Sequence, residues 1–464
     1  MTSALLDLGA GELAAALRDR RATVAEHTAA VLDRIARRDP RLRAVSQVRA
    51  AAAADAAALD ALDGVDAARL PLFGVPVAIK EEIPVAGLVT TFGGRANTAV
   101  APADATVVAR LRAAGAVVVA TTHMPEFGQT PFTDGAWGAT ATPWAPGRSP
   151  GGSSGGSAVA VAAGLVPLAL GGDSGGSIRI PTAWCGVCGL KPSRGRLTTA
   201  PYPDLWYRLG TYGPLARTVE DLRLALGVLD GGAARGAGAH RQACPDAWPP
   251  ADGAPARLRV GWTTGCPLPG VRASDEVVDG VAAAARALRS RGHDVARGRV
   301  RWAGTPAAFL AQCYRGVLDE ARRVDHPERL ERRSLETAAL GRLVGERMLN
   351  SALRASDAMA RATARLFERI DVLLMPVSPT IAAPLRRWAD RGTLAVQAAS
   401  TPAIAFTSYW NLAGNPAASV PVGLSAAGLP LAVQVVGPHG HDLRVLAVAQ
   451  QIAAALPGPG RAPV

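Results

Sequence analysis

The chain has 464 residues, of which 49% are hydrophobic, 19% charged and 5% aromatic. This composition can build a core and excludes a disordered protein. The 50 basic residues outnumber the 38 acidic ones and give a formal net charge of +12, which by itself favours a nucleic-acid partner. Only two of the basic residues are lysines, Lys80 and Lys191. A chain that otherwise uses arginine has therefore kept lysine at two positions.

Residues 1–60 carry apolar side chains at spacings of three and four, which predicts helices. The run 71–80 is a short β-type segment, 106–114 is an amphipathic helix, and 116–120 is an apolar run typical of a buried strand. Strand, helix and strand in this order predict a largely parallel sheet that helices cover.

The stretch 146–195 is rich in glycine and serine. Further along, Thr218 lies three residues before Asp221, which predicts a helix N-terminus. Residues 231–256 are rich in Gly, Ala and Pro and predict a surface linker. The later expected elements are a strand-helix-strand unit in 257–295, long helices in 334–369, and strands at 371–377 and 429–437.

The five cysteines, an odd number, favour a reducing cytosol over a disulfide framework. Cys185 and Cys188 form a CxxC, but no second pair or histidine cluster completes a zinc site, so we expect buried packing. His439 and His441 are interpreted as loop residues. The first twenty residues lack a secretory pattern and no stretch suits a membrane span, so we expect a cytoplasmic location.

Three serine-containing motifs suggest different chemistries. Residues 151–155 match the GxSxG nucleophile elbow, but no later histidine has a context that completes that triad. Residues 172–176 match the GDSGG string of chymotrypsin-like proteases, but the expected sheet argues against a β-barrel. A phosphate-binding loop is also disfavoured, because GGSSGGS lacks the lysine that reaches the phosphates.

Several long motifs together carry a family resemblance. They are LFGVPVAIK ending at Lys80, PGGSSGGSAVAVAAG from Pro150, GGDSGGSIRIPTAWCGVCGLKPSRGR from Gly171, GPLARTVEDL from Gly213, DVLLMPVSPT from Asp371 and FTSYWNLAGNPAASVPVG from Phe406. In this order they closely resemble the amidase signature family. The resemblance implies one large α/β/α domain with a mostly parallel, twisted mixed central sheet that has helices on both faces.

The resemblance implies a catalytic triad of Lys80, Ser153 and Ser177. Ser177 would attack the amide carbonyl, while Ser153 would relay its proton to Lys80 and later return one to the leaving amine. The residues alone give Lys80 a reason to be lysine: a base must be able to lose its proton, and arginine stays protonated. Histidine is not placed to do this work.

The glycine loop would supply the oxyanion hole from its backbone N–H groups, those of Ser174, Gly175, Gly176 and Ser177. Glycine suits this role because a loop without β-carbons can turn its amides inward. Beyond these groups, supporting roles are expected for Ser154, Asp173 and Arg179. We expect Arg179 to anchor the loop, and binding of a substrate carboxylate is the alternative role for it.

Two positions depart from the family pattern, and a third is unexplained. Glu81 stands where the family usually has aspartate, and His123 falls within the usual GKTNMPE run, where we favour a polar loop role. Lys191 lies in the motif GLKPS, and the sequence gives no physical reason for a lysine there.

The expected organisation is a single amidase-type domain over 1–464. Its parts are an N-terminal helical region at 1–60, a catalytic core at 61–230, a variable, mainly helical insertion at 231–370 and a return to the core at 371–464. The variable regions around residues 123–140, 200–212 and 300–410 would form the substrate pocket, with the candidates Trp206, Tyr207, Tyr212, Phe309, Tyr314 and Trp410.

The expected function is hydrolysis of a carbon–nitrogen amide bond through an acyl-enzyme, with no metal and no organic cofactor. The partner would be a small-molecule amide, with no nucleic acid and no membrane, and a homodimer is compatible with the sequence. Two alternatives use the same triad: an amide-forming acyltransferase, and the A-type subunit of a glutamine-dependent amidotransferase, which Ile180 after the SIR motif disfavours. A third is an arginine-rich binder of nucleic acid or an acidic partner through residues 286–369, which is disfavoured because the arginines are interspersed with acids.

Overall fold

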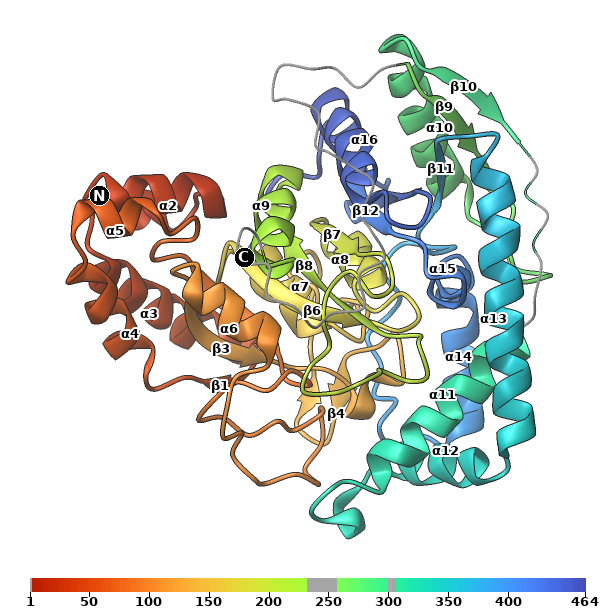
Figure 1. The fold of residues 1–464 in the computed structure, drawn as a ribbon, viewed down its shortest axis with the longest axis horizontal. Coiled ribbons are helices and arrows are strands. Elements are labelled where there is room, and N and C mark those ends of the chain that lie inside the picture. Colours follow the sequence, from red (N-terminus) through yellow and green to blue (C-terminus); the bar gives the residue numbers. More distant parts are fainter. Residues whose placement is uncertain (1, 232–256, 299, 301, 303–305) are drawn as a thin grey trace.

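The computed structural model describes residues 2–231, 257–298, 300, 302 and 306–464. Within them, a mixed sheet of 11 strands forms the centre, with helices on both faces (Figure 1). In spatial order its strands are β1 (Val45–Val48), β3 (Val117–Thr122), β2 (Pro76–Lys80), β6 (Leu168–Asp173), β8 (Thr211–Ala216), β7 (Cys188–Lys191), β12 (Ala417–Leu424), β13 (Pro430–Val436), β11 (Val372–Pro376), β9 (Arg259–Trp262) and β10 (Asp294–Arg297). A separate hairpin joins β4 (Asp134–Gly135) and β5 (Gly138–Ala139).

The α/β class and the helix-covered mixed sheet are confirmed, but the sheet is not mostly parallel. Strand β2 is parallel to β3 and β6, and β9 is parallel to β10 and β11. The other neighbouring strands are antiparallel. For one antiparallel pair the reason is a local connection: β12 and β13 form a hairpin closed where the Ser425 amide donates to the Leu429 carbonyl at 2.8 Å, and short connections of this kind favour antiparallel pairing.

Alternate side chains of the central strands enter two different cores. In β2, Val77 and Ile79 pack in one core, whereas Ala78 packs in the other. This follows from the two-residue period of a strand that is buried on both faces. The helices that contribute to the first core are α2 (Ala10–Arg18), α6 (Thr106–Ala113), α9 (Val219–Leu229), α10 (Asp275–Ser290) and α16 (Asp442–Ala455).

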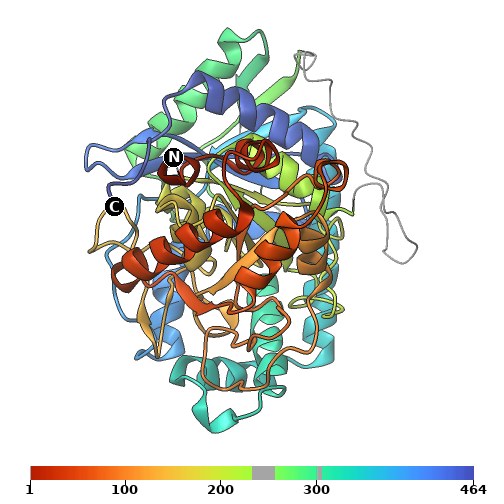
Figure 2. The ribbon, with the colours of Figure 1, turned by 90° about the vertical axis from the view of Figure 1, so that its left-hand side faces the viewer.

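The helices that contribute to the second core are α3 (Val24–Leu42), α4 (Ala52–Asp60), α7 (Gly155–Ala162) and α8 (Arg179–Cys185), together with residues of α1 (Thr2–Leu5), α2 (Ala10–Arg18) and α5 (Gly64–Ala68). Figure 2 looks onto the N-terminal helices, drawn in red and orange. A further layer is formed by α11 (Pro306–Ala321), α12 (Arg332–Arg342), α13 (Glu346–Phe367), α14 (Thr393–Ala403) and α15 (Ser408–Ala413) (Figure 1). Two short 3-10 turns are η1 (Glu126–Gly128) and η2 (Pro327–Arg329).

The expected elements occur close to their expected places, with one interruption at the start. Helices α1 to α4 fall within residues 1–60, but β1 lies between α3 and α4 and pairs with β3. Helix α9 begins as predicted, because the Asp221 amide donates to the Thr218 hydroxyl at 3.2 Å. The expected linker lies, apart from Gly231, outside the described residues. Within the described part of the chain, no helix is long and apolar enough to cross a bilayer.

Candidate active site

Two neighbouring parallel strands bring the lysine and the glycine loop to the same edge of the sheet. Lys80 is the last residue of β2, and the loop 174–178 follows the end of β6, which pairs with β2. The carboxyl ends of parallel strands are the usual place for ligands in α/β sheets. Sheet topology thus joins residues that lie almost a hundred positions apart.

Lys80 contacts a serine and a carboxylate. Its Nζ donates to Ser153 Oγ at 2.7 Å and lies 3.0 Å from Glu82 Oε1. Lys80 and Ser153 are buried, and Ser153 follows a cis peptide bond from Gly152. The structure therefore brings Lys80 and Ser153 together, and it adds Glu82, which the sequence interpretation did not identify.

Ser154 connects the Ser153 segment to the glycine loop. Its hydroxyl donates to the Gly172 carbonyl at 3.0 Å and accepts from the Gly172 amide at 3.3 Å. Its backbone amide donates to the Ser177 carbonyl at 3.0 Å. Ser177 itself is partly exposed. These bonds hold the two serine segments side by side.

Arg179 and Asp173 form a buried ion pair beneath the loop. The Arg179 Nη2 lies 2.9 Å from Asp173 Oδ1, and both side chains are 0% exposed. Burial raises the pKa of Asp173, but the charge and hydrogen bonds of Arg179 outweigh burial and hold that pKa well below its usual range. The remaining Arg179 donors bind Thr407 O, Gln434 Oε1 and Asn411 Oδ1. With its donors bound in this way, Arg179 holds the loop from within the protein.

Asp173 also fixes the backbone of the loop. Its Oδ1 accepts from the Gly176 amide at 2.8 Å, and its Oδ2 accepts from the Ile178 amide at 3.1 Å. Within the described residues, the amides of Ser174, Gly175 and Ser177 have no such acceptor. The Gly176 amide is therefore already engaged, whereas its neighbours are available to a bound group.

Glu81 and His123, the two residues that depart from the family pattern, lie next to each other, with His123 Nδ1 3.4 Å from Glu81 Oε1. Glu81 is buried and accepts from the Met124 amide at 2.9 Å, from Thr91 Oγ1 at 2.5 Å and from Ser46 Oγ. Burial raises the pKa of Glu81, but the neighbouring His123 and the two hydroxyls lower it overall. His123 stacks on Trp137 with ring centroids 3.7 Å apart. Both residues thus contact the protein's own loops.

Lys191 belongs to the buried charge cluster under the loop. It is the last residue of β7, and its Nζ donates to the Pro192 carbonyl at 2.9 Å. Burial and the nearby Arg179 charge lower the pKa of Lys191 to about 7, whereas Asp173 opposes this change. A lysine that can become neutral fits a site where an arginine would add a second permanent charge.

A small cavity of about 20 Å³ opens beside Lys80 and Ser153. Its other lining residues are Glu82, Phe92, Phe127, Gly128, Gly172, Asp173, Ser174, Leu205, Trp206, Tyr212 and Glu320. Phe92, Phe127 and Trp206 have positive φ angles of 51°, 56° and 50°. Bulky residues rarely adopt this strained conformation, which concentrates at functional sites.

The expected aromatic pocket residues divide between this cavity and other places. Trp206 and Tyr212 line it, and a Cβ on Gly175 would approach Phe309 Cζ to 2.8 Å, so Phe309 lies against the glycine loop. Trp410 is fully buried in the core, and Tyr207 bonds Asp319. Glu82, Phe127 and Glu320 were not identified from the sequence. The sequence contained a signal for Glu82, because it lies two residues after Lys80. It contained no such signal for Glu320.

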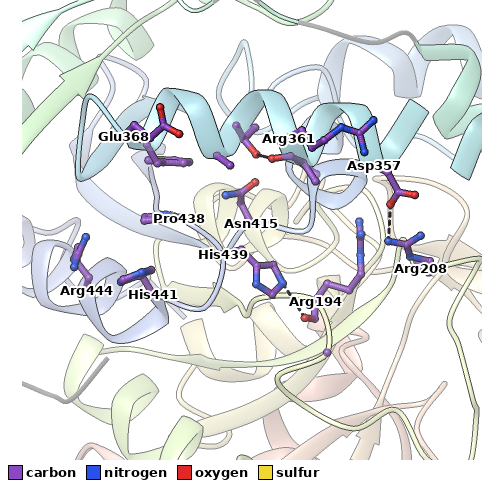
Figure 3. Close-up of a pocket in the computed structure, with 16 residues that line it drawn as sticks. Arg194, Arg208, Asp357, Arg361, Glu368, Asn415, Pro438, His439, His441 and Arg444 are labelled. Atoms are coloured by element: carbon purple, nitrogen blue, oxygen red, sulfur yellow. Dashed lines mark hydrogen bonds and ion pairs between the residues drawn. The ribbon is translucent and has the colours of Figure 1, made fainter. Parts of the chain in front are cut away.

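A larger cavity of about 1140 Å³ lies elsewhere, and no residue of the expected triad lines it. Figure 3 shows His439 and His441 at this cavity, with His439 Nε2 3.1 Å from the Arg194 carbonyl and Arg208 bonded to Asp357 at 2.8 Å. The two histidines are therefore cavity-lining residues that lie apart from Lys80 and Ser153.

Cys185 and Cys188 are both buried, and burial raises the pKa of each thiol to about 12. Across the described ranges, no group of three or more His, Cys, Asp or Glu side chains is arranged to hold a metal ion.

The Amidase family profile matches residues 26–446. The chain belongs to the amidase signature family. AmiB2 of Mycobacterium tuberculosis (strain ATCC 25618 / H37Rv), which carries an amidase name, is 41% identical over 444 residues, covering 93% of this chain and 92% of AmiB2. This amidase signature protein is therefore an amide hydrolase.

Two further relatives show how broad the amidase signature family is. The A-type subunit of the Glutamyl-tRNA(Gln) amidotransferase of Synechococcus sp. (strain RCC307) is 34% identical over 465 residues, covering 94% of each chain. The structure of 6-aminohexanoate cyclic dimer hydrolase complexed with substrate superposes with a TM-score of 0.84, 29% identity and 99% coverage of each chain.

Proposed function

We propose that the protein hydrolyses a small-molecule carbon–nitrogen amide through Ser177, Ser153 and Lys80. The observation that carries this proposal is the 2.7 Å bond from Lys80 to Ser153, formed beside the loop that holds Ser177. An amide needs an activated nucleophile, a cradle for the oxyanion and a proton for the leaving nitrogen, and these groups supply all three.

In the proposed first half-reaction, Ser177 Oγ bonds to the carbonyl carbon while its proton passes through Ser153 Oγ to neutral Lys80. The amides of Ser174, Gly175 and Ser177 stabilise the oxyanion, because the Gly176 amide is committed to Asp173. The carbon–nitrogen bond then breaks, and Ser153 returns a proton to the leaving amine. Water attacks the acyl-Ser177 ester by the same route in reverse.

Glu82 helps to position the lysine of the relay. Its Oε1 lies 3.0 Å from Lys80 Nζ, which in turn donates to Ser153 Oγ at 2.7 Å. An arginine at position 80 would keep its proton and block this relay.

Lys80→Arg is accordingly expected to lower kcat by about 10²- to 10⁴-fold, the range typical of a lost acid–base group. Initial rates on a verified amide substrate at neutral pH measure the effect. Arg354→Lys, which makes the reverse exchange at an exposed position of α13, should leave the rate unchanged. A Lys80→Arg protein with wild-type kcat would rule out Lys80 as the base.

Gly176→Ala is expected to lower kcat by about a hundredfold or more, because misplacing reacting groups by about 1 Å has effects of this size. Gly176 has φ 128°, and a Cβ there would lie 2.3 Å from Thr407 Oγ1. The control is Gly227→Ala in α9, where nothing lies within 4 Å of the new Cβ. Steady-state kinetics of both variants test this, and equal rates would show that the loop tolerates the change.

The amidotransferase is a second candidate, because an amidotransferase relative of the A type matches 94% of this chain. A hydrolase, an amidotransferase and an acyltransferase all form the same acyl-enzyme. They differ in whether water or an amine attacks it. Mass spectrometry of the products from aliphatic, aryl and peptide amides, with glutamine and with added amines, separates them. Free acid as the main product in every mixture supports hydrolysis, whereas amide formation at its expense would contradict it.

A further inference from the structure

The cavity beside Lys80 and Ser153 is acidic and aromatic in a strongly basic chain. The chain has a net charge of +12, yet the one cation lining this cavity within the described residues is Lys80. Three carboxylates line it as well. Glu82 is paired with Lys80, and Asp173 is paired with Arg179. Glu320 is the carboxylate that remains.

Glu320 comes from the last turn of α11 and reaches a cavity otherwise built by the catalytic core. Among the described residues, its carboxylate has neither an ion pair nor a side-chain hydrogen bond. Burial raises the pKa of Glu320 to about 7, with Arg323 opposing and Glu82 reinforcing the change. Glu320 is partly exposed, and the like charge of Glu82 disfavours its ionised form, so a bound cation would stabilise the carboxylate.

Tyr212 gives an independent indication that a ligand belongs here. It is 0% exposed, it lines the same cavity, and its hydroxyl has no hydrogen-bond partner among the described residues. Buried tyrosine hydroxyls nearly always have a partner. An unpaired hydroxyl and an unpaired carboxylate on one cavity are both able to accept an N–H donor.

The aromatic lining further limits the chemical class of ligand that fits the cavity. Phe92, Phe127 and Trp206 also line the cavity, and aromatic faces attract cations. An anion would be repelled by Glu82 and Glu320, and a neutral apolar group would leave the Glu320 carboxylate unpaired. At about 20 Å³ the cavity has room for one water-sized group, and an ammonium headgroup has that size.

We propose that the substrate is an amide that also carries a protonated amine, and that Glu320 and Tyr212 bind this ammonium group while the amide lies at Ser177. This inference rests on the proposed function, since it names the substrate class of that site. Glu320 is then a specificity-determining residue outside the triad.

The test compares amides that differ only in the ammonium group. The probes are the ω-amino amides H₃N⁺–(CH₂)ₙ–CONH₂ with one to five methylenes, each with its isostere in which methyl replaces the ammonium. We expect the best amino amide to exceed its isostere in kcat/KM by roughly ten- to a hundredfold, the range for a hydrogen bond to a charged group. Glu320→Gln should bring this ratio close to one. Glu328→Gln, at an exposed position, is the matched control and should keep the wild-type ratio.

A binding measurement separates this inference from the proposed function. Butylammonium and butanol are titrated calorimetrically into wild-type and Glu320→Gln protein. Binding of butylammonium that exceeds that of butanol and is lost in Glu320→Gln supports the cation site, even if no amide is hydrolysed and the proposed function fails. Hydrolysis of both amides at equal kcat/KM, or equal losses for both in Glu320→Gln, overturns the inference and leaves the triad intact.

Discussion

Ser177→Ala is expected to lower kcat by about 10⁴-fold or more on any amide that the wild-type protein cleaves. Removal of a nucleophile that acts as part of a unit has effects of this order, and the residual rate comes from binding and the oxyanion donors. The substitution removes one oxygen from a partly exposed side chain, so the fold should persist. Initial rates at saturating substrate, with thermal unfolding as the check on folding, measure the result.

The matched control is Ser351→Ala, at an exposed position of α13, which should keep wild-type kcat and stability. A second readout tests the covalent step itself. Acid-quenched wild-type enzyme under turnover should carry an acyl group on the peptide that contains Ser177, and Ser177→Ala should carry none. An adduct on Ser174 instead would assign the nucleophile to the other serine of the loop, and a Ser177→Ala protein with full activity would disprove the mechanism.

The strands around the site could be predicted because their signal is local. Residues of β2 and β3 form short apolar runs bounded by loops, and a helix of period 3.6 lies between them, so type and order follow from the sequence. Lys80 is then expected at the end of a strand, because the apolar run of β2 stops there. The motifs that surround it identified the family, and the comparisons confirmed it.

The order of strands could not be predicted from the same signals. Strand β7 pairs with β12, whose sequence lies more than two hundred residues later, and β8 runs antiparallel between β6 and β7. A buried strand is apolar whichever neighbour it pairs with, so its residues do not encode its direction. Sequence periodicity therefore favoured a largely parallel sheet, whereas most neighbouring strands in the structure are antiparallel.

Glu320 and Lys191 show a second limit of sequence reasoning. Each gains its meaning from residues that approach it only in three dimensions: Glu320 from the catalytic cavity, Lys191 from the buried Arg179 and Asp173. A glutamate at the end of an amphipathic helix is ordinarily a solvent-exposed residue. Long-range convergence, rather than any local pattern, places it beside the triad.

Arg179→Met is expected to lower the free energy of unfolding by about 3–5 kcal/mol, the usual effect of removing one partner of a buried ion pair. The loss exceeds what methionine regains by packing, because Asp173 would stay buried without its partner and Gln434 and Asn411 would each lose a donor. Urea unfolding measures the change. Arg354→Met, on the exposed side of α13, should stay within about 0.5 kcal/mol of wild type.

The Arg179–Asp173 ion pair also makes the stability difference between wild type and Arg179→Met depend on pH. The folded pKa of Asp173 lies below its unfolded value, so the stabilisation that it contributes is complete above the unfolded pKa of about 4 and is lost as the pH falls further. Without Arg179 this depression of the pKa largely disappears. The stability difference between wild type and Arg179→Met should therefore be full at pH 7 and shrink below about pH 4. A stability difference that stays constant down to pH 3 would show that Arg179 stabilises the fold by packing rather than through the ion pair. The loop that holds Ser177 would then be supported mainly by the neutral contacts of Asn411 and Thr407.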